Sequence, residues 1–388
     1  MRIALSLELL DPRRGGAEGA TLRLIRALAA RGHEVHVLTR AVSCELPASV
    51  QVHLIPARRP TVALRHWAFA NGVARVLREN SFDVSVACGR GFAEDAVWSH
   101  NGGQAAASRG ETRSYYFSPF RQWLRRGQDF YSPKGWAYRA LERKRFAGRS
   151  PRILAVSQMV ADEFQRDYGA DPKRIRVVYN QVELERFGAE KIRPLRTAAR
   201  AALGLAEGEL AILFVGQNFK RKGLRTLVEA AGELQRQERS FQVLVAGSTP
   251  ERGVAYARLA QRLGCGERLR FLGQHARVEE LYAAADVLCL PTFYDPCALV
   301  VVEGMAGGLP VITSRYNGAS EMLHHGVDGF VLQEPADTAE FAGVLEKLFD
   351  PKLREQISAA AIATARAVCL QNPANDIVAA VEDLARTR

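Results

Sequence analysis

The sequence of 388 residues lacks the marks of several protein classes. No apolar run reaches the roughly 18 residues of a membrane-spanning helix, because charges or glycines interrupt every candidate. The segment after Met1 has no long signal-peptide core and is better explained as a first strand. The six cysteines are scattered without a CxxC pair, which argues against a disulfide framework or a zinc site and favours a reducing cytoplasm.

Common catalytic and nucleotide-binding signatures are missing as well. No Ser-His-Asp set and no HExxH sequence is legible, so hydrolase interpretations have little support. Neither the GxGxxG fingerprint of dinucleotide-binding proteins nor a Walker A loop is present. No helix-turn-helix, RRM-type or zinc-finger pattern supports nucleic-acid binding, so no nucleic-acid partner is expected.

What is present is the composition and periodicity of a two-domain α/β protein. Apolar residues make up 47% and charged residues 24% of a chain too long for one ordinary core. Short aliphatic runs alternate with segments of helical periodicity, which is typical of parallel-sheet units. The predicted strands cover residues 2–7, 34–39, 50–56, 83–88, 96–99, 153–157 and 175–179, and then 211–216, 242–247, 269–273, 286–291, 310–313 and 329–332.

A polar stretch at residues 180–195 is expected to be a loop at the domain boundary. We therefore predict an N-terminal domain of residues 1–188 and a C-terminal domain of residues 189–373. A last helix within residues 374–388 is expected to pack back on the first domain. In such sheets ligands bind at the carboxyl ends of the strands, so a cleft between the two domains is the expected site.

The net charge lies entirely in the first half of the chain. Residues 1–190 hold 30 lysines and arginines against 19 acidic residues, whereas the rest holds 23 of each. The densest stretch begins at Arg121 and ends at Arg152, and aromatic residues lie within it and just before it. This basic–aromatic stretch is either a solvated helix or a surface for anionic lipid or phosphorylated glycan.

Asp295 and Glu303 are separated by an apolar run and followed by a Gly-rich turn. If a helix begins near Leu299, Asp295 lies on the loop before it and Glu303 lies about one turn inside. Carboxylates accept hydrogen bonds in pairs, so these two could hold a ribose diol and a hexose hydroxyl. The alternative is a pair of solvated acids that flank a core helix.

Three further segments could take part in chemistry. Gly15 and Gly16 precede a helix, where backbone amides can approach an anion, although a tight turn without ligand is as plausible. Lys220, Arg221 and Lys222 crowd a strand-to-helix turn and would suit a diphosphate, unless they are solvated loop residues.

The third segment contains His100, which follows a short strand on a Gly-rich loop. It is well placed to touch a substrate, and a structural role is equally plausible.

Taken together, these segments resemble the family 4 retaining glycosyltransferases with the GT-B fold, over nearly the whole chain. The resemblance rests on motifs that occur in the family's order. They are Gly15-Gly16-Ala17-Glu18, the segments 153–157 and 178–187, Val215-Gly216 through Lys222-Gly223, the segment 281–286, and Asp295 to Gly308. The segments 219–223 and 138–146 are similar to the lipopolysaccharide-core glucosyltransferases of that family.

The resemblance implies roles for individual residues. Glu303 would bind the donor ribose and Asp295 would contact the transferred sugar, in the place of the family's glutamate. Arg221 and Lys222 would neutralise the diphosphate, which Gly15 and Gly16 would approach from the other domain.

Two roles concern the remaining loops. His100 would orient a hydroxyl near the reacting sugar, and Gln274 and His275 would face the nucleobase. Gln217 stands where many relatives have arginine, so the phosphate charge falls more on Arg221 and Lys222.

The implied enzyme is a metal-independent hexosyltransferase without a cofactor, whose co-substrate is a nucleoside-diphosphate sugar, expected to be a UDP-sugar. Its acceptor would be a lipopolysaccharide-core or other membrane-linked glycan. It would be cytoplasmic or peripheral on the inner face of the membrane. The alternatives are another GT-B enzyme, namely an epimerase or a phosphorylase with a pyridoxal lysine, a transferase with a soluble small acceptor, or a basic binding protein without activity.

Overall fold

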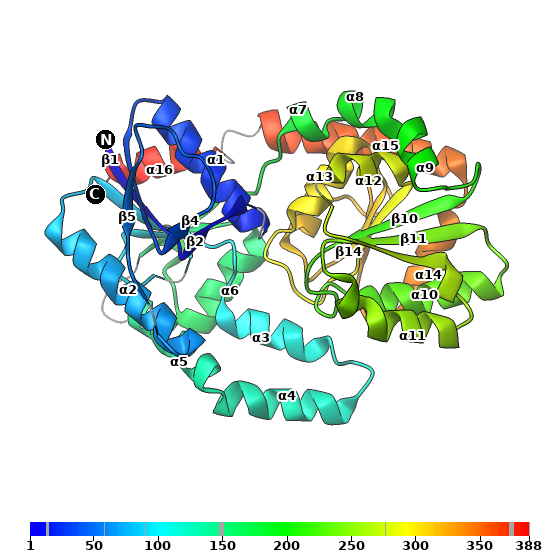
Figure 1. Cartoon of the computed structure of the whole chain (residues 1–388), viewed down its shortest axis with the longest axis horizontal. Coiled ribbons are helices and arrows are strands. Elements are labelled where there is room, and N and C mark those ends of the chain that lie inside the picture. The colour runs from blue at the N-terminus through cyan, green and yellow to red at the C-terminus, as the bar shows by residue number, and fades with distance from the viewer. Residues whose placement is uncertain are drawn as a thin grey trace. The chain divides into compact units, whose positions relative to one another are not determined.

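The computed structural model describes residues 1–12, 15–57, 59–89, 91–146, 151–275, 277–371 and 376–387. The chain forms two compact units. The first contains Met1–Thr112, Ser118–Tyr179 and Pro373–Arg388, and the second contains Arg113–Phe117 and Asn180–Asn372. Both are α/β units in which helices flank a parallel sheet, which confirms the predicted fold class (Figure 1).

The sheet of the first unit has seven strands in the order β5-β3-β1-β6-β7-β8-β9. These are β1 (Arg2–Ser6), β3 (Glu34–Thr39), β5 (Gln51–Leu54), β6 (Val84–Ala87), β7 (Ala96–Trp98), β8 (Arg152–Ala155) and β9 (Ile175–Val177). The bounds of all seven lie within two residues of the predicted ones. The sequence pattern did not predict the short parallel pair β2 (Leu9–Leu10) and β4 (Ala41–Val42).

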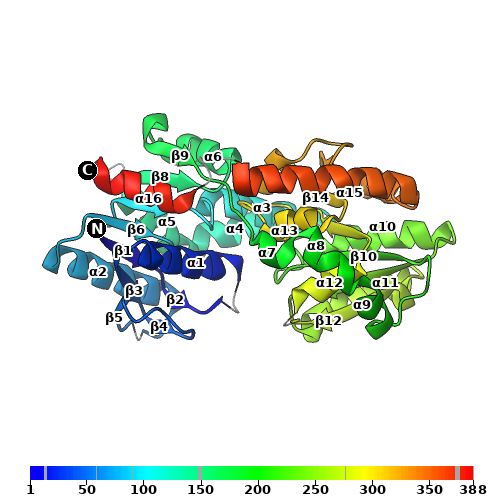
Figure 2. The same cartoon turned by 90° about the horizontal axis from the view of Figure 1, so that it is seen from above.

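Seven helices surround this sheet among the described residues: α1 (Gly16–Ala30), α2 (Val62–Glu79), α3 (Gln104–Arg113), α4 (Pro119–Tyr131), α5 (Pro133–Phe146), α6 (Gln158–Tyr168) and α16 (Ile377–Arg386). Helix α16 belongs to the first unit although it is last in the chain, and it packs beside α1 (Figure 2). His33 on the turn after α1 pairs with Glu382 at 2.8 Å. Residues 374 and 375, where the last helix was expected to begin, lie outside the described residues.

The second sheet has six parallel strands in the order β12-β11-β10-β13-β14-β15. They are β10 (Leu210–Val215), β11 (Phe241–Ala246), β12 (Leu269–Gly273), β13 (Val287–Leu290), β14 (Val311–Ser314) and β15 (Phe330–Leu332). The interior residues of β10, β11, β13 and β14 are almost fully buried, because a parallel sheet is covered on both faces, whereas the edge strand β12 is half-buried. The longer helices on it are α9 (Arg196–Ala202), α10 (Leu224–Arg236), α11 (Val254–Arg262), α12 (Val278–Ala284), α13 (Leu299–Gly307), α14 (Thr338–Lys347) and α15 (Pro351–Arg366).

The boundary between the units differs from the expected one. The second unit begins at Asn180 and not at residue 189, because the Asn180 side-chain amide donates to the Cys297 carbonyl at 2.9 Å. Residues 180–195 are also not a plain polar loop. They contain the short helices α7 (Leu184–Phe187) and α8 (Ala189–Ile192), which pack on α13 through the buried Phe187 and Ile192.

Candidate functional site

The loops after the parallel strands of the second sheet all emerge at one edge, where such folds bind ligands. Backbone bonds tie three of these loops together: Gly216 N–H donates to Ala246 at 3.0 Å, and Gly247 N–H donates to Gly273 at 2.8 Å. Gly247 has φ +100°, and a Cβ there would lie 2.9 Å from the backbone nitrogen of Gly216. At this edge the backbones of the loops at Gly216 and Gly247 therefore lie too close together to leave room for a side chain at Gly247.

The turn after β10 carries the cations Lys220, Arg221 and Lys222. The Asn218 side chain accepts from the Arg221 N–H at 3.2 Å, and its carbonyl accepts from the Lys222 N–H at 2.9 Å. Gly223 ends the turn with φ +84°, and a Cβ there would lie 2.0 Å from the Pro291 carbonyl oxygen. This close approach holds the cation-bearing turn against the loop that follows β13.

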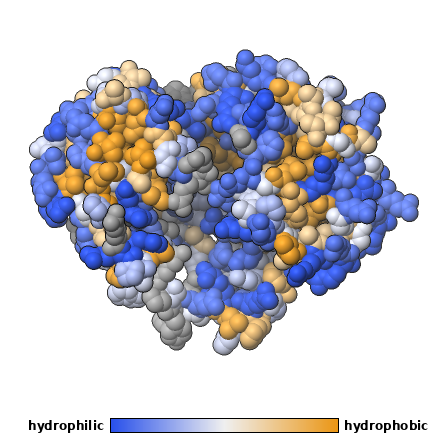
Figure 3. All heavy atoms as spheres, in the orientation of Figure 1, coloured by the Kyte–Doolittle hydropathy of each residue, from blue (hydrophilic) through white to orange (hydrophobic). Residues whose placement is uncertain are grey.

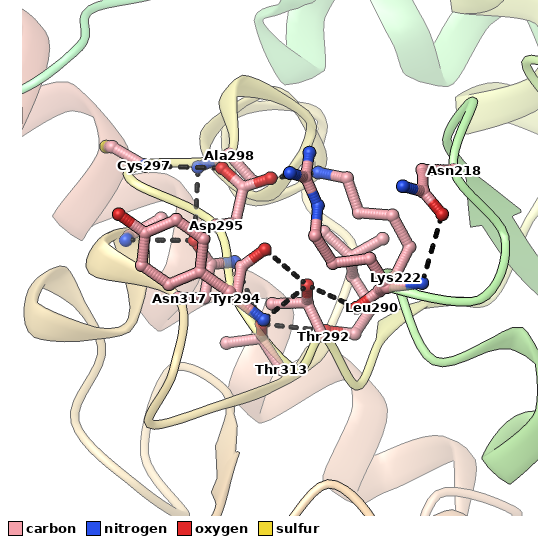
Figure 4. Close-up of polar contacts among 12 residues, drawn as sticks. Asn218, Lys222, Leu290, Thr292, Tyr294, Asp295, Cys297, Ala298, Thr313 and Asn317 are labelled. Carbon is pink, nitrogen blue, oxygen red and sulfur yellow. Dashed lines mark hydrogen bonds and ion pairs between the residues drawn. The ribbon is translucent and has the colours of Figure 1, made fainter. Parts of the chain in front are cut away.

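Asp295 lies on that loop and forms an ion pair with Lys222 (Figure 4). Its residue exposure is only 8%, and its other carboxylate oxygen accepts from the Cys297 N–H at 3.2 Å. Sequence reasoning assigned Asp295 to the sugar and Lys222 to the diphosphate. The structure brings the two side chains into direct contact, so each is the counter-ion of the other.

Arg221 differs from its neighbours because its Nε is buried and has no hydrogen-bond partner among the described residues. Its backbone is fixed, since its carbonyl accepts from the Phe293 N–H at 2.7 Å and from the Thr292 hydroxyl at 3.0 Å. A buried donor without a partner is costly, and such groups in native proteins usually have a reason. An anionic ligand at this turn would supply the missing acceptor.

Helix α13 begins at Leu299, so Asp295 lies on the loop before it and Glu303 one turn inside, as predicted. The loop owes its shape to Asn317, which is fully buried. The Asn317 side-chain oxygen accepts from the Ala298 N–H at 3.1 Å, and its amide donates to Thr313 at 3.0 Å (Figure 4). Sequence reasoning missed Asn317, because an Asn-Gly dipeptide indicates only a turn.

The Glu303 carboxylate accepts a hydrogen bond of 2.6 Å from the hydroxyl of Tyr282 on α12. Tyr282 is 1% exposed, and burial together with Glu303 raises the pKa of its phenol well above the ordinary value, so it stays a donor. Tyr282 therefore orients Glu303. The motif at residues 281–286 contained it, but nothing in its spacing indicated the contact.

Gln274 and His275 follow β12 at the same sheet edge and are exposed. The His275 Nδ1 faces the carbonyl of Arg277 in its own loop at 3.1 Å. Within the described part of the chain, no hydrogen bond connects either residue to Arg221, Lys222 or Asp295. Their expected role at the nucleobase remains a prediction.

In the first unit, His100 follows β7 and its ring lies against Trp98, with centroids 3.9 Å apart. The Nε2 of His100 is buried and has no hydrogen-bond partner among the described residues. Burial, with a smaller contribution from Arg23, lowers the pKa of His100 to about 3. The imidazole is therefore neutral at physiological pH, and its Nε2 can exchange a hydrogen bond with a ligand hydroxyl.

This lowered pKa predicts a pH-dependent stability. A histidine with folded pKa near 3 and ordinary value 6.5 stabilises the fold above pH 6.5, and the contribution is lost as pH falls toward 3. Between these values the unfolding free energy of the wild type should fall more steeply than that of His100→Gln, by at most about 1.4 kcal/mol per pH unit. Urea unfolding at pH 7, 6, 5 and 4 measures the difference. The exposed His275→Gln is the control, and equal slopes for His100→Gln and wild type would contradict the burial argument.

A cavity of about 200 Å³ lies in the first unit at the carboxyl edge of its sheet, beside the first turn of α1. Its lining includes Glu8, Glu18, Thr21, His66 and Asn101. The His66 Nδ1 contacts a Glu8 carboxylate oxygen at 2.6 Å, and its Nε2 lies 2.8 Å from the Tyr138 hydroxyl.

Neither Glu8 nor His66 was singled out in the sequence, because they come from separate elements. Gly15 caps α1 and Gly16 begins it, so the structure places this glycine pair next to the cavity. The relation of the pair to a diphosphate remains a prediction.

The basic–aromatic stretch is not one continuous surface. Tyr138 and Arg145 are each 7% exposed, and Arg145 donates to the carbonyls of Gly91 and Gly89 at 2.7 and 3.1 Å. Arg149 lies outside the described residues. The exposed residues of the stretch include Arg121, Trp123 and Arg126 on α4, Trp136, and Arg143 and Lys144 on α5. The aromatic residues 115–117 before the stretch belong to the second unit.

No group of three or more His, Cys, Asp or Glu residues in the described ranges could hold a metal ion. Likewise, no helix in those ranges is long and apolar enough to cross a membrane.

Two α/β units with parallel sheets, and with polar side chains gathered where the strands end, form the architecture of the GT-B fold. Residues 14–186 match the family model described as Glycosyltransferase Family 4, and residues 196–364 match Glycosyl transferases group 1. The two models together cover most of the chain, so the chain belongs to the glycosyltransferases that they describe. This confirms the resemblance to the family 4 glycosyltransferases seen in the sequence.

Individual relatives extend this assignment. The chain is 26% identical over 341 residues to the lipopolysaccharide glucosyltransferase WaaG of Escherichia coli K12, covering 86% of each protein. It is 29% identical to a D-inositol 3-phosphate glycosyltransferase of Geodermatophilus obscurus, covering 94% of this chain and 84% of the relative. The crystal structure of WaaG has a TM-score of 0.79 with 24% identity and covers 99% of both chains, which supports the fold.

Proposed function

We propose that this glycosyltransferase transfers a hexose from a UDP-sugar, with retention of configuration and without a metal ion. The proposed acceptor is a lipopolysaccharide-core or other membrane-linked glycan. The similarity to WaaG supports this acceptor class, and the similarity to the D-inositol 3-phosphate glycosyltransferase leaves a soluble small acceptor as the second candidate.

The observation that carries the donor proposal is the arrangement of charge at the turn after β10. The buried Arg221 Nε has no hydrogen-bond partner among the described residues, and the neighbouring Lys222 pairs with the Asp295 carboxylate. A diphosphate would satisfy Arg221 and compete with Asp295 for Lys222. Asp295, once released from Lys222, would accept a hydrogen bond from a hydroxyl of the transferred sugar.

The resemblance to retaining glycosyltransferases implies the chemistry of the transfer step. The bond between the anomeric carbon and the diphosphate oxygen breaks, and the bond to the acceptor oxygen forms on the same face. The acceptor hydroxyl passes its proton to the departing diphosphate. Arg221 and Lys222 stabilise the charge that develops on the leaving group, which is the largest contribution the protein can make to such a step.

Glu303 and His100 complete the proposal. Glu303, oriented by Tyr282, would bind the two ribose hydroxyls. The neutral His100, whose buried Nε2 has no partner among the described residues, would hold a hydroxyl near the reacting sugar. The carboxylate-rich cavity beside α1 would receive hydroxyls of the acceptor, because carboxylates accept hydrogen bonds.

A donor panel tests the function. Wild-type protein should show a saturable rise in melting temperature with UDP or a UDP-sugar, and a smaller one with ADP, GDP and dTDP counterparts. Slow hydrolysis of the same donor should fall about 100-fold in Glu303→Ala, since the ribose contact contributes to binding and orientation. A Glu303→Ala protein that hydrolyses donor as fast as wild type would remove Glu303 from the site. A panel without any stabilising nucleotide would contradict the transferase.

Membrane association is proposed for α4. Phe120, Trp123 and Leu124 share a helical face and are 66%, 67% and 40% exposed, with Arg121, Arg125 and Arg126 beside them. Figure 3 shows apolar atoms at the lower edge of the molecule, where Figure 1 draws α4. Exposed aromatic residues among arginines are typical of a surface that binds anionic lipid headgroups.

Phe120→Ser/Trp123→Ser should lower binding to vesicles that contain anionic lipid about tenfold, because it removes the apolar face and leaves the charges. Flotation at two salt concentrations measures both contributions, and binding should fall with salt. Leu54→Ser, which alters an aliphatic side chain that is 65% exposed on β5, is the control. Flotation that is indifferent to anionic lipid and to salt would show that α4 is an ordinary solvated helix.

A further inference from the structure

A short piece of the chain between α3 and α4 packs with the second unit, although the residues on both sides belong to the first. This crossing segment, Arg113–Phe117, leaves the first unit after Thr112, and the chain returns to that unit at Ser118. Four of its five residues make ring or cation contacts with side chains of the second unit. Their partners are all close in sequence to residues of the candidate donor site.

Tyr116 is the centre of these contacts. Its ring stacks on Phe293 at a centroid distance of 5.5 Å, and its hydroxyl donates to the Glu229 carboxylate on α10. Burial and Glu229 raise the pKa of the Tyr116 phenol, so the hydroxyl remains a donor. One side chain thus joins the helix that follows the cation-bearing turn to the loop that precedes Asp295.

Phe293 links Tyr116 to Arg221. The Phe293 N–H donates to the Arg221 carbonyl at 2.7 Å, so a displacement of the Phe293 ring would shift the backbone that holds the Arg221 side chain. Glu229 also accepts from Arg225 at 2.8 Å, and the Arg225 guanidinium lies 3.9 Å from the Phe117 ring centroid. The crossing segment therefore also contacts α10, the helix that begins where the turn ends.

Two further cation–π contacts complete the arrangement. Lys220 Nζ lies 3.8 Å from the Tyr115 ring centroid, which directs this cation toward the crossing segment. The Arg113 guanidinium lies 4.3 Å from the ring of Tyr316, whose carbonyl accepts from the Asp295 N–H at 2.9 Å. The crossing segment thus contacts the Lys220–Gly223 turn, the Phe293–Asp295 loop and the Tyr316–Asn317 turn.

We infer that the crossing segment positions the diphosphate-binding part of the donor site, and that Tyr116 is its main positioning residue. The crossing segment sets the spacing between Arg221, the proposed ligand of the diphosphate, and Asp295, the proposed ligand of the transferred sugar. Tyr116 itself touches neither the substrate nor the reacting atoms. The inference rests on the proposed function, because it assumes that this site takes a nucleoside diphosphate.

The test separates the ring of Tyr116 from its hydroxyl, with UDP as the probe. Tyr116→Leu should weaken UDP binding about tenfold and raise the donor KM, with the acceptor KM unchanged, because the stack on Phe293 is lost. Tyr116→Phe keeps the ring and should restore most of the affinity. Phe117→Leu, a milder change at an exposed position, should weaken UDP binding about threefold.

Phe349→Leu is the matched control. Like Phe117, Phe349 is an aromatic residue of the second unit that contacts an arginine: the Arg239 guanidinium lies 5.2 Å from its ring centroid. It should lower the melting temperature without changing the UDP dissociation constant, which separates positioning from general stability. Unchanged UDP affinity in Tyr116→Leu, with wild type binding UDP, would overturn this inference alone. Wild-type protein that binds no nucleoside diphosphate would instead contradict the proposed function.

Discussion

Replacing Gly223 with alanine is expected to abolish nucleotide binding and to destabilise the second unit by about 2–5 kcal/mol. At φ +84° a non-glycine residue is strained, which costs about 1–2 kcal/mol. The new Cβ would also lie 2.0 Å from the Pro291 carbonyl oxygen, so the turn and the loop after β13 must separate. That separation moves Arg221 and Lys222 away from Asp295. Urea unfolding and UDP titration measure the two effects.

Gly264→Ala is the control for backbone strain alone. Gly264 has φ +74°, and a Cβ there would meet no atom within 4 Å. It should lower stability by about 1–2 kcal/mol and leave UDP binding unchanged. If Gly223→Ala behaves like Gly264→Ala in both measurements, the close approach of the two loops does not shape the site.

The central strands of both sheets were predictable from the sequence because they are buried on both faces. Residues 211–215 and 243–246 are short, continuous apolar runs, each followed by a glycine, and this length and flanking sequence favour a buried strand over a helix. The prediction of a loop at residues 180–195 was wrong because this segment gives no clear apolar pattern. Its polar residues hide Phe187 and Ile192, which are spaced for helices too short to give a periodic signal.

The site was only partly predictable. A helix beginning near Leu299 follows from the apolar run after Asp295, so the placement of Asp295 and Glu303 could be derived from spacing. The pairing of Asp295 with Lys222 could not, since 73 positions separate them and only the parallel order β10-β13 brings their loops together. Tyr282 and Asn317 were missed because their roles depend on burial and on partners from other elements.

The crossing segment shows most clearly what a local pattern cannot reveal. Tyr115, Tyr116 and Phe117 precede a basic stretch, and their composition suggested that they share one interfacial surface with it. In the structure their rings contact Lys220, Phe293 and Arg225 of the second unit. The path of the chain places them in the second unit and the exposed aromatic residues of α4 in the first, and composition alone does not reveal this difference.

Arg221→Ala should be the most damaging single substitution for catalysis that leaves the fold intact. Because the Arg221 Nε is buried without a partner among the described residues, removing the side chain takes away an unsatisfied donor and should leave the unfolding free energy nearly unchanged. A charge-assisted hydrogen bond to the diphosphate contributes about 1.5–3 kcal/mol, so the UDP dissociation constant should rise about 10- to 150-fold.

The effect on kcat/KM should be larger still, at about 100- to 1,000-fold, because negative charge grows on the departing diphosphate. Calorimetric titration with UDP, donor hydrolysis and urea unfolding together resolve the three expectations. Arg236→Ala is the matched control, since Arg236 lies in the last turn of α10, is largely exposed and pairs with Glu233. Arg221→Ala with wild-type UDP affinity would mean that the buried guanidinium serves the fold, and the diphosphate must then be neutralised elsewhere.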